Sequence, residues 1–273
     1  MSVGVEHSPV ANARMYSVTP AVKKAWQDVL HFVLATAGLP WRVIDHDAPA
    51  PLSALWSRDD LGLALMCGLP FSQRARQPLL LAAPVPSPAR YQGQPIYFTD
   101  LAVRADSQFR TLEDTFGGVV GYTVADSLSG HIALRRHLLR HRPSSGTRLY
   151  REAVGGLIHG RGVIEALADG RIDVGPIDSY YHDLLRRSDP GFAAQVRVLA
   201  TTDAAPIPPF VATAAMDSAT LVRLREALAA VGQTAELSAQ RDVLLLKGFA
   251  VPDPLQYRQL TDMYRQAFSF EGW

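Results

Sequence analysis

Serine and histidine residues gather in one short segment that could bind an anion. The segment lies between a predicted strand and a predicted helix and reads Asp126-Ser127-Leu128-Ser129-Gly130-His131. Backbone N–H groups at the start of a helix have no partner within the helix, and the helix dipole adds partial positive charge there. The hydroxyl groups of Ser127 and Ser129 would add two donors. The segment is therefore a candidate anion site, and its plainer interpretation is an N-cap, in which one serine satisfies the first turn.

Two further segments occupy similar positions between a strand and a helix. The first of them contains His159 and reads Gly155-Gly156-Leu157-Ile158-His159-Gly160. An imidazole there could donate to an anion, cap the helix or lie in the core. Asp178 ends a predicted buried strand and begins the next helix. Its carboxylate could bind an amine or hydroxyl group of a ligand, or cap that helix.

A metal site is the third chemical possibility, and the sequence argues against it. His137 and His141 are four residues apart on a predicted helix, so both imidazoles would face one side. Their arginine neighbours would make that face cationic and repel a metal ion: Arg135, Arg136, Arg140 and Arg142. The chain also lacks a Walker loop, a dinucleotide fingerprint and a nucleophile elbow. We therefore expect no metal, no cofactor and no catalytic residue.

Alternating apolar patterns predict the elements that would carry these segments. Short β-like runs alternate with amphipathic helical runs, which is typical of an α/β fold with mainly parallel sheets flanked by helices. In such folds, binding sites form at the carboxyl ends of strands. Two extended stretches, near residues 97–104 and 197–205, indicate a middle lobe inserted between the halves of an outer lobe. The predicted boundaries are residues 1–98 plus 204–273 for lobe I and residues 99–203 for lobe II.

Charge and hydropathy limit the partners. Lys plus Arg is 27 and Asp plus Glu is 26, so no net field would attract nucleic acid or an anionic membrane surface. No segment reaches the roughly 18 to 20 uninterrupted apolar residues that a membrane span needs. Residues 1–14 contain no apolar run of the secretory type, so the sequence as written predicts no export by the usual route and a cytoplasmic location.

These segments, in this order, resemble the phosphate, phosphite and phosphonate substrate-binding family of ABC transporters. The matching stretches are Ala13-Arg14-Met15-Tyr16, Leu65-Met66-Cys67-Gly68-Leu69-Pro70, the stretches 97–107 and 112–118, Asp126-Ser127-Leu128-Ser129-Gly130, His159 and the stretch 166–179. The resemblance implies a two-lobed periplasmic-binding-protein-like fold of type II with a two-strand hinge. It also implies that the lobes close around a small anion, such as phosphate or a phosphonate, for uptake through an ABC permease.

The resemblance further implies a set of ligand-binding residues. On one lobe it places Tyr16, Cys67 and Gly68, and facing them Ser127, Leu128, Ser129, Gly130 and His131, with His159 and Asp178 completing the pocket. One departure concerns Leu128, because phosphonate binders carry a hydroxyl residue at that position and leucine removes a donor. The family is normally exported, so a periplasmic location would require a leader upstream of this sequence.

Two other functions are open at this point. A cytoplasmic domain that senses a metabolite for a protein partner would fit a chain without an export signal. An enzyme of the pyrimidine-precursor-synthase type would share the fold, but it would need a reactive histidine or cysteine and usually iron. The single cysteine, Cys67, with no thiol near it in the sequence, argues against the enzyme.

Overall fold

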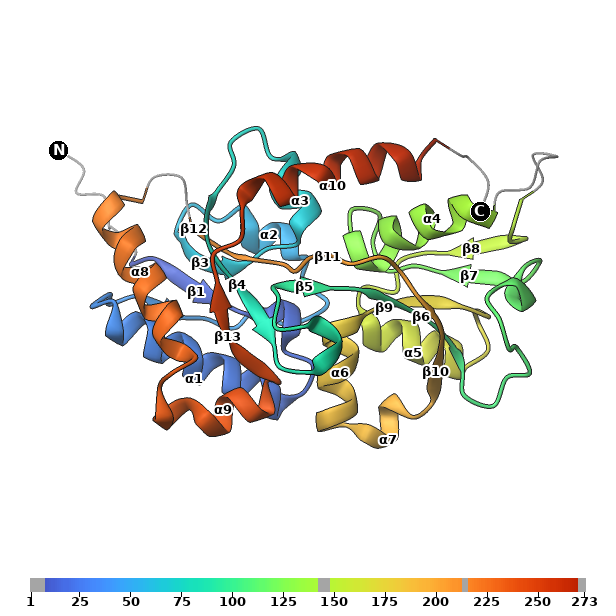
Figure 1. Ribbon diagram of the computed structural model, residues 1–273, viewed down its shortest axis with the longest axis horizontal. Helices are drawn as coiled ribbons and strands as arrows, with labels where there is room; N and C mark the ends of the chain where they lie inside the picture. Colours follow the sequence, from blue (N-terminus) through green and yellow to red (C-terminus); the bar gives the residue numbers. More distant parts are fainter. Residues whose placement is uncertain (1–7, 142–147, 213–215, 270–273) are drawn as a thin grey trace. The chain divides into compact units, whose positions relative to one another are not determined.

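The chain forms two compact units (Figure 1). The computed structural model describes residues 8–141, 148–212 and 216–269. Unit 1 comprises Met1–Met66, Ala75–Pro95 and Pro208–Pro252, and unit 2 comprises Cys67–Arg74, Ile96–Ile207 and Asp253–Trp273. Each unit combines strands with helices, which agrees with the predicted α/β class.

Unit 1 is built on a six-stranded sheet in the order β13-β4-β12-β3-β1-β2. Its strands are β1 (Val10–Asn12), β2 (Arg42–Val43), β3 (Leu61–Leu65), β4 (Leu79–Pro86), β12 (Phe210–Ala212) and β13 (Leu246–Ala250). Strand β1 pairs in parallel with β2 and β3, whereas β12 is antiparallel to β3 and β4, and β13 is antiparallel to β4. Its helices are α1 (Pro20–Thr36), α2 (Leu52–Trp56), α8 (Ser218–Val231) and α9 (Ser238–Val243), with short turns η1 (Arg14–Tyr16), η2 (Ala89–Tyr91) and η6 (Ala235–Leu237).

Helix α1 shows how local sequence sets the elements of unit 1. Thr19 caps its start by accepting a hydrogen bond from the N–H of Val22 at 3.4 Å, and proline occupies the first helical position. Gly38 follows its end with φ +64°, which glycine adopts readily. The Trp26 ring of this helix is buried, with its centroid 6.1 Å from that of Phe210. Cap and buried face therefore place α1 against the sheet.

The described residues of unit 2 include three small sets of strands. Strands β6 (Thr99–Arg104), β9 (Gly175–Asp178) and β10 (Val196–Thr201) form an antiparallel sheet in the order β10-β6-β9. Strands β7 (Val119–Gly121) and β8 (Glu152–Val154) pair in parallel, and β5 (Ile96–Tyr97) pairs antiparallel with β11 (Ala205–Pro206). Its helices are α3 (Gly68–Gln73), α4 (Ala133–Leu138), α5 (Gly160–Ala168), α6 (Ser179–Ser188), α7 (Pro190–Ala193) and α10 (Pro254–Ala267), with short turns η3 (Glu113–Thr115), η4 (Leu128–Ile132) and η5 (Leu139–His141).

The sheets are mixed, and the expectation of mainly parallel sheets is wrong in both units. The two extended stretches seen in the sequence become β5 with β6 and β10 with β11. One carries the chain into the middle segment and the other carries it back, so they run in opposite directions and pair antiparallel. Apolar patterning predicts that a segment is a strand but does not fix the direction of its partner.

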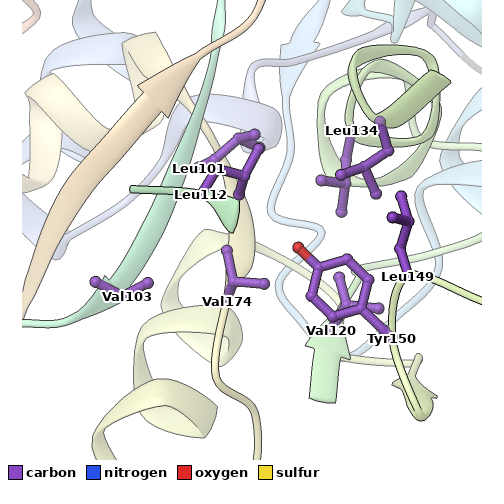
Figure 2. Close-up of a cluster of buried hydrophobic side chains, with 9 residues drawn as sticks. Leu101, Val103, Leu112, Val120, Leu134, Leu149, Tyr150 and Val174 are labelled. Atoms are coloured by element: carbon purple, nitrogen blue, oxygen red, sulfur yellow. The ribbon is translucent and has the colours of Figure 1, made fainter. Parts of the chain in front are cut away.

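A cluster of buried side chains anchors the helix that follows the predicted anion segment. Figure 2 shows Leu101 and Val103 of β6 in the same cluster as Leu134 of α4 and Tyr150. The full cluster comprises Leu101, Val103, Leu112, Val120, Leu134, Leu138, Leu149, Tyr150 and Val174. The Tyr150 hydroxyl lies 2.9 Å from Oγ1 of Thr115. The inner face of α4 is therefore fixed to the core of unit 2.

The compact units differ from the predicted lobe boundaries at α3 and α10. Both helices were assigned to lobe I, yet they pack within unit 2, where they lie side by side (Figure 1). A Cβ added at Gly68 would lie 2.7 Å from Cδ1 of Leu260, and the rings of Phe71 and Tyr257 are 5.3 Å apart. The predicted lobe boundaries stay a prediction.

Candidate functional site

The central segment of the site is the serine turn, residues 127–131, which opens a continuous helix over residues 128–138. Ser127 caps it, because its Oγ accepts a hydrogen bond from the N–H of Gly130 at 3.0 Å. The first turn is a π-type turn, in which the Ile132 N–H donates to the Ser127 carbonyl at 3.1 Å. A Cβ at Gly130 would lie 1.8 Å from Oγ1 of Thr123, so this turn requires glycine. The N-cap interpretation of Ser127 is confirmed.

Ser129 joins the serine turn to two strands of unit 2. Its side chain is 9% exposed, and its Oγ donates to Oδ2 of Asp178 at 3.5 Å. Its carbonyl accepts a hydrogen bond from Oγ1 of Thr99 at 3.1 Å. The Ser129 hydroxyl is therefore held at the carboxyl end of β9.

Asp178 is both the end of β9 and the N-cap of α6. Its Oδ1 accepts hydrogen bonds from the N–H groups of Tyr180 at 2.9 Å and Tyr181 at 3.1 Å. The other carboxylate oxygen, Oδ2, faces Ser129. The capping interpretation of Asp178 is confirmed, and its second oxygen brings a negative charge beside the serine turn.

Cys67 belongs to unit 2 in this structure and lies at the serine turn. The resemblance had placed it on the lobe opposite the turn. Burial raises the pKa of the Cys67 thiol to about 11, an effect that the nearby Asp126 and Asp178 charges reinforce and the backbone N–H groups of Leu128 and Leu69 partly offset. The thiol is therefore protonated at neutral pH and serves as a weak hydrogen-bond donor rather than a nucleophile.

Tyr97 lies close to the serine turn and is not among the predicted ligand-binding residues. It lies on β5, is 1% exposed, and its hydroxyl has no hydrogen bond of normal geometry among the described residues, although Ser129 lies close by. Burial, and then the nearness of Cys67 and Asp178, raise the pKa of Tyr97 well above its ordinary value of 10.0. A buried hydroxyl without a hydrogen bond of normal geometry costs about 1–3 kcal/mol, so the Tyr97 O–H is a buried donor close to Ser129.

His131 is buried at the side of the serine turn and is electrically neutral. Its Nδ1 lies 2.8 Å from the carbonyl oxygen of Ala125, which can only accept, so Nδ1 carries the proton. The ring stacks on Tyr122 with centroids 4.5 Å apart. Burial lowers the pKa of His131 below its ordinary value of 6.5, although the Ala125 carbonyl opposes that effect. His131 therefore brings no positive charge to the site at neutral pH.

His159 caps helix α5, as one of its predicted interpretations stated. Its Nδ1 accepts a hydrogen bond from the N–H of Gly162 at 3.2 Å. In the neutral ring the proton is therefore on Nε2, which makes that atom a donor. The ring stacks on Tyr181 at 6.4 Å, and the Tyr181 N–H binds Asp178. His159, Asp178 and Ser129 thus form one connected series of contacts in unit 2.

Three of the predicted ligand-binding residues, Tyr16, Gly68 and Leu128, contact other parts of the protein. Tyr16 lies in unit 1, in η1, and is 1% exposed. Gly68 approaches Leu260 of α10. Leu128 is fully buried, and its backbone N–H reaches the Cys67 thiol. The ligand contacts of these residues, as of the whole predicted set, stay a prediction.

The histidine pair on α4 and η5 forms no metal centre in the part of the chain that the structure describes. The rings of His137 and His141 are 6.1 Å apart, and Nδ1 of His141 lies 3.3 Å from Oε1 of Glu113. Within residues 8–141, 148–212 and 216–269, no group of three or more His, Cys, Asp or Glu side chains could hold a metal ion. Arg142 lies outside the described residues. Over those same residues, no helix has the length and apolar character needed to cross a membrane.

Comparisons with solved structures support the two-lobed fold. A binding-protein component of an ABC phosphonate transporter from Pseudomonas aeruginosa superposes with a TM-score of 0.77 at 19% identity, covering 94% of this chain and 86% of that one. PhnD1 from Prochlorococcus marinus, solved with methylphosphonate, superposes with a TM-score of 0.77 at 12% identity, covering 94% of this chain and 97% of that one. A Xanthomonas citri protein bound to ATP superposes with a TM-score of 0.64 at 21% identity, covering 97% of this chain and 98% of that one. The predicted periplasmic-binding-protein-like fold is confirmed.

Sequence comparison identifies the family. No curated protein matches the chain. The family model described as the periplasmic phosphonate substrate-binding protein of ABC transporters matches residues 18–257, which is most of the chain. The predicted family and the predicted role as a substrate-binding protein are confirmed. The chain belongs to the family of periplasmic substrate-binding proteins of phosphonate ABC transporters.

Proposed function

We propose that this chain binds a small phosphate- or phosphonate-like anion at the serine turn of unit 2. The observation that carries the proposal is the gathering of buried donors at one helix start. The Tyr97 hydroxyl lacks a partner of normal geometry among the described residues, and it lies beside the Ser129 side chain. The helix start adds partial positive charge, which stabilises an anion without a charged side chain.

Asp178 gives the proposed site a preferred ligand orientation. A carboxylate beside an anion is unfavourable unless the ligand presents a donor to it. Because Oδ2 of Asp178 faces Ser129, a protonated ligand oxygen or an amine would lie on the Asp178 side. The unprotonated anionic oxygens would then lie toward the turn and Tyr97. His159, with its proton on Nε2, is the proposed donor at the start of α5.

The proposed transport role follows from the family. Members of the family serve ABC transporters as periplasmic substrate-binding proteins. For this chain we infer a periplasmic location with a leader upstream, delivery of the ligand to a permease, and no catalysis. The protonated Cys67 thiol supports the last point, because a pKa of about 11 leaves little thiolate at neutral pH. A ligand that binds one arrangement of the two lobes more tightly shifts the population toward it, and Tyr16 stays a predicted contact from unit 1.

Isothermal titration calorimetry with methylphosphonate, phosphate, phosphite and sulfate tests the binding role. At least one of these anions should bind. Ser129→Ala should weaken it by about ten- to a hundred-fold, because a hydrogen bond to a charged group contributes about 1.5–3 kcal/mol. Ser188→Ala is the matched control, since Ser188 bonds the Leu184 carbonyl within α6 and should leave affinity unchanged.

Two results would contradict the proposal. Absence of binding for all four anions would do so, and so would binding that Ser129→Ala leaves unchanged. Saturable binding of an amino acid or another metabolite without a phosphorus or sulfur oxyanion would instead assign a different class of ligand to this fold.

A further inference from the structure

Helix α10 contacts both segments that the resemblance implicates in ligand binding. At its first half, Tyr257 packs edge-on against Phe71 of α3, and its hydroxyl donates to the Ile207 carbonyl at 2.7 Å. Ser72 and Thr261 hydroxyls lie 3.2 Å apart on the same pair of helices. Helix α3 begins directly after Cys67. The first half of α10 is thus fixed to the element that follows Cys67.

The last turn of α10 contacts the helix that begins at the serine turn. Nε of Arg135 donates to the Ala267 carbonyl at 3.1 Å. This carbonyl is one of those that a helix leaves without an internal partner at its C-terminal end. The Arg135 guanidinium carbon lies 4.6 Å from the centroid of the Phe268 ring, and Arg136 Nε donates to Gln266 at 3.2 Å. Arg135 is 9% exposed and Phe268 is 41% exposed, so the guanidinium is shielded from water while part of the Phe268 side chain is not.

The Phe268 ring also meets His131 within the serine turn itself. The two centroids are 5.8 Å apart with an interplanar angle of 78°, an edge-to-face arrangement. Tyr122 stacks on the same imidazole at 4.5 Å. His131 is therefore held between a ring from the end of the β7 segment and a ring from the end of α10.

The π-type geometry of the turn makes this contact informative. Turns with hydrogen bonds from residue i+5 to residue i are rare and occur often at functional sites. Less populated backbone conformations persist where the surrounding structure determines them. His131 and Ile132 belong to this turn, and Arg135 follows one helical turn later. The side chains of His131 and Arg135, one helical turn apart, therefore both contact the last turn of α10.

We propose that the last turn of α10 holds the serine turn in its anion-binding conformation, and that Phe268 is a positioning residue that acts through His131. This inference rests on the proposed function, because it assigns a role in anion affinity to a residue outside the ligand contacts. It predicts that the C-terminal end of α10 and the anion are coupled, so that loosening one weakens the other.

The test compares Phe268→Ala with two other variants in the full chain. Titration with methylphosphonate and with phosphate should show that Phe268→Ala weakens binding by about three- to thirty-fold, the range expected for losing one edge-to-face pair and one cation–π contact. Phe268→Tyr keeps the ring and should bind within about two-fold of the unmodified protein. Leu255→Ala removes an exposed side chain at the other end of α10 and should leave affinity unchanged.

A spectroscopic measurement separates positioning from general stability. The pKa of His131, followed by NMR of its ring, should rise toward its ordinary value of 6.5 in Phe268→Ala, because water would reach the imidazole. A lower melting temperature with unchanged affinity and unchanged His131 pKa would overturn the inference and leave the proposed function intact. Failure of the unmodified protein to bind any of the anions would overturn both.

Discussion

An ion-pair cluster of unit 1 is exposed, whereas two polar side chains of the serine turn in unit 2 are buried. In unit 1, Lys23 pairs with Asp45 and Asp47, each at 2.8 Å, and both carboxylates are more than half exposed. Exposed pairs of this kind contribute only about 0–1 kcal/mol to stability. In unit 2, Ser129 and His131 are buried at the start of a helix. Burial of polar groups is unfavourable unless they are hydrogen-bonded, and here Ser129 donates to Asp178 while His131 bonds the Ala125 carbonyl, so buried polar contacts fix the serine turn of unit 2.

A second buried pair strengthens that contrast. Asp100 of β6 and His182 of α6 have fully buried side chains, with Oδ2 and Nδ1 2.9 Å apart. Thr201 of β10 donates to the other oxygen of Asp100 at 3.1 Å. This network ties the two strands that enter and leave unit 2 to the helix that Asp178 caps. The proposed site therefore lies on elements fixed by buried polar contacts.

The largest expected effect compares two tightly packed glycines, one in each unit. Gly130→Ala should abolish measurable anion binding and destabilise the protein by about 3 kcal/mol, because the new Cβ would clash with Thr123. Gly62→Ala in unit 1 would place a Cβ 2.6 Å from the Trp41 ring and should also destabilise, while the folded protein keeps its affinity. Calorimetric titration with denaturant melts checks both. Equal loss of affinity in the two variants would break the comparison.

The next effect is the pH dependence that Cys67 gives to unit 2. Burial raises the pKa of this thiol from 9.0 to about 11, so the unfolded chain ionises first. The stability from the protonated thiol is full below about pH 9 and is lost as pH rises toward 11, by about 2 kcal/mol. Urea melts between about pH 9 and 11 should show that the free energy of unfolding falls more steeply with pH in the unmodified protein than in Cys67→Ala. Rapid alkylation of native Cys67 at pH 8 would contradict the assignment.

A smaller effect compares hydroxyl caps in the two units. Ser127→Ala and Thr19→Ala should each destabilise by about 1 kcal/mol, because each removes an N-cap. Anion affinity should fall only for Ser127→Ala, by a few-fold, since its turn would fray where the anion binds. Thermal melts and titrations of both variants test this. An affinity loss in Thr19→Ala would show that cap removal acts through global stability.

The smallest effect is a change of ligand preference at Asp178. Asp178→Asn keeps an oxygen that can cap α6, so stability should change by less than about 0.5 kcal/mol. Removing the negative charge should increase the affinity for sulfate by a few-fold and decrease the affinity for an aminoalkylphosphonate by a similar factor. Competition titrations with both ligands make the comparison. If the affinities for sulfate and for the aminoalkylphosphonate changed in the same direction, Asp178 would not face the ligand.

Local features of the site were predictable from the sequence, because they depend on residues close together in the chain. Ser127, His159 and Asp178 each cap the helix that the sequence predicted to follow them. The placement of Cys67 in unit 2 was not predictable, since it follows from the packing of α3 on Leu260, far along the chain. The Tyr97 hydroxyl was missed for a similar reason. Alternation predicts a strand there but does not show which polar groups surround a side chain.

The most direct test of the central claim is amide chemical-shift mapping during titration with methylphosphonate. An anion at the serine turn should shift the backbone amides of Leu128, Ser129, Gly130 and His131 strongly, together with the His159 ring protons. The amides around Gly191, which lies in open space in unit 2, should not move. Saturable binding that leaves the four turn amides unshifted would contradict the account.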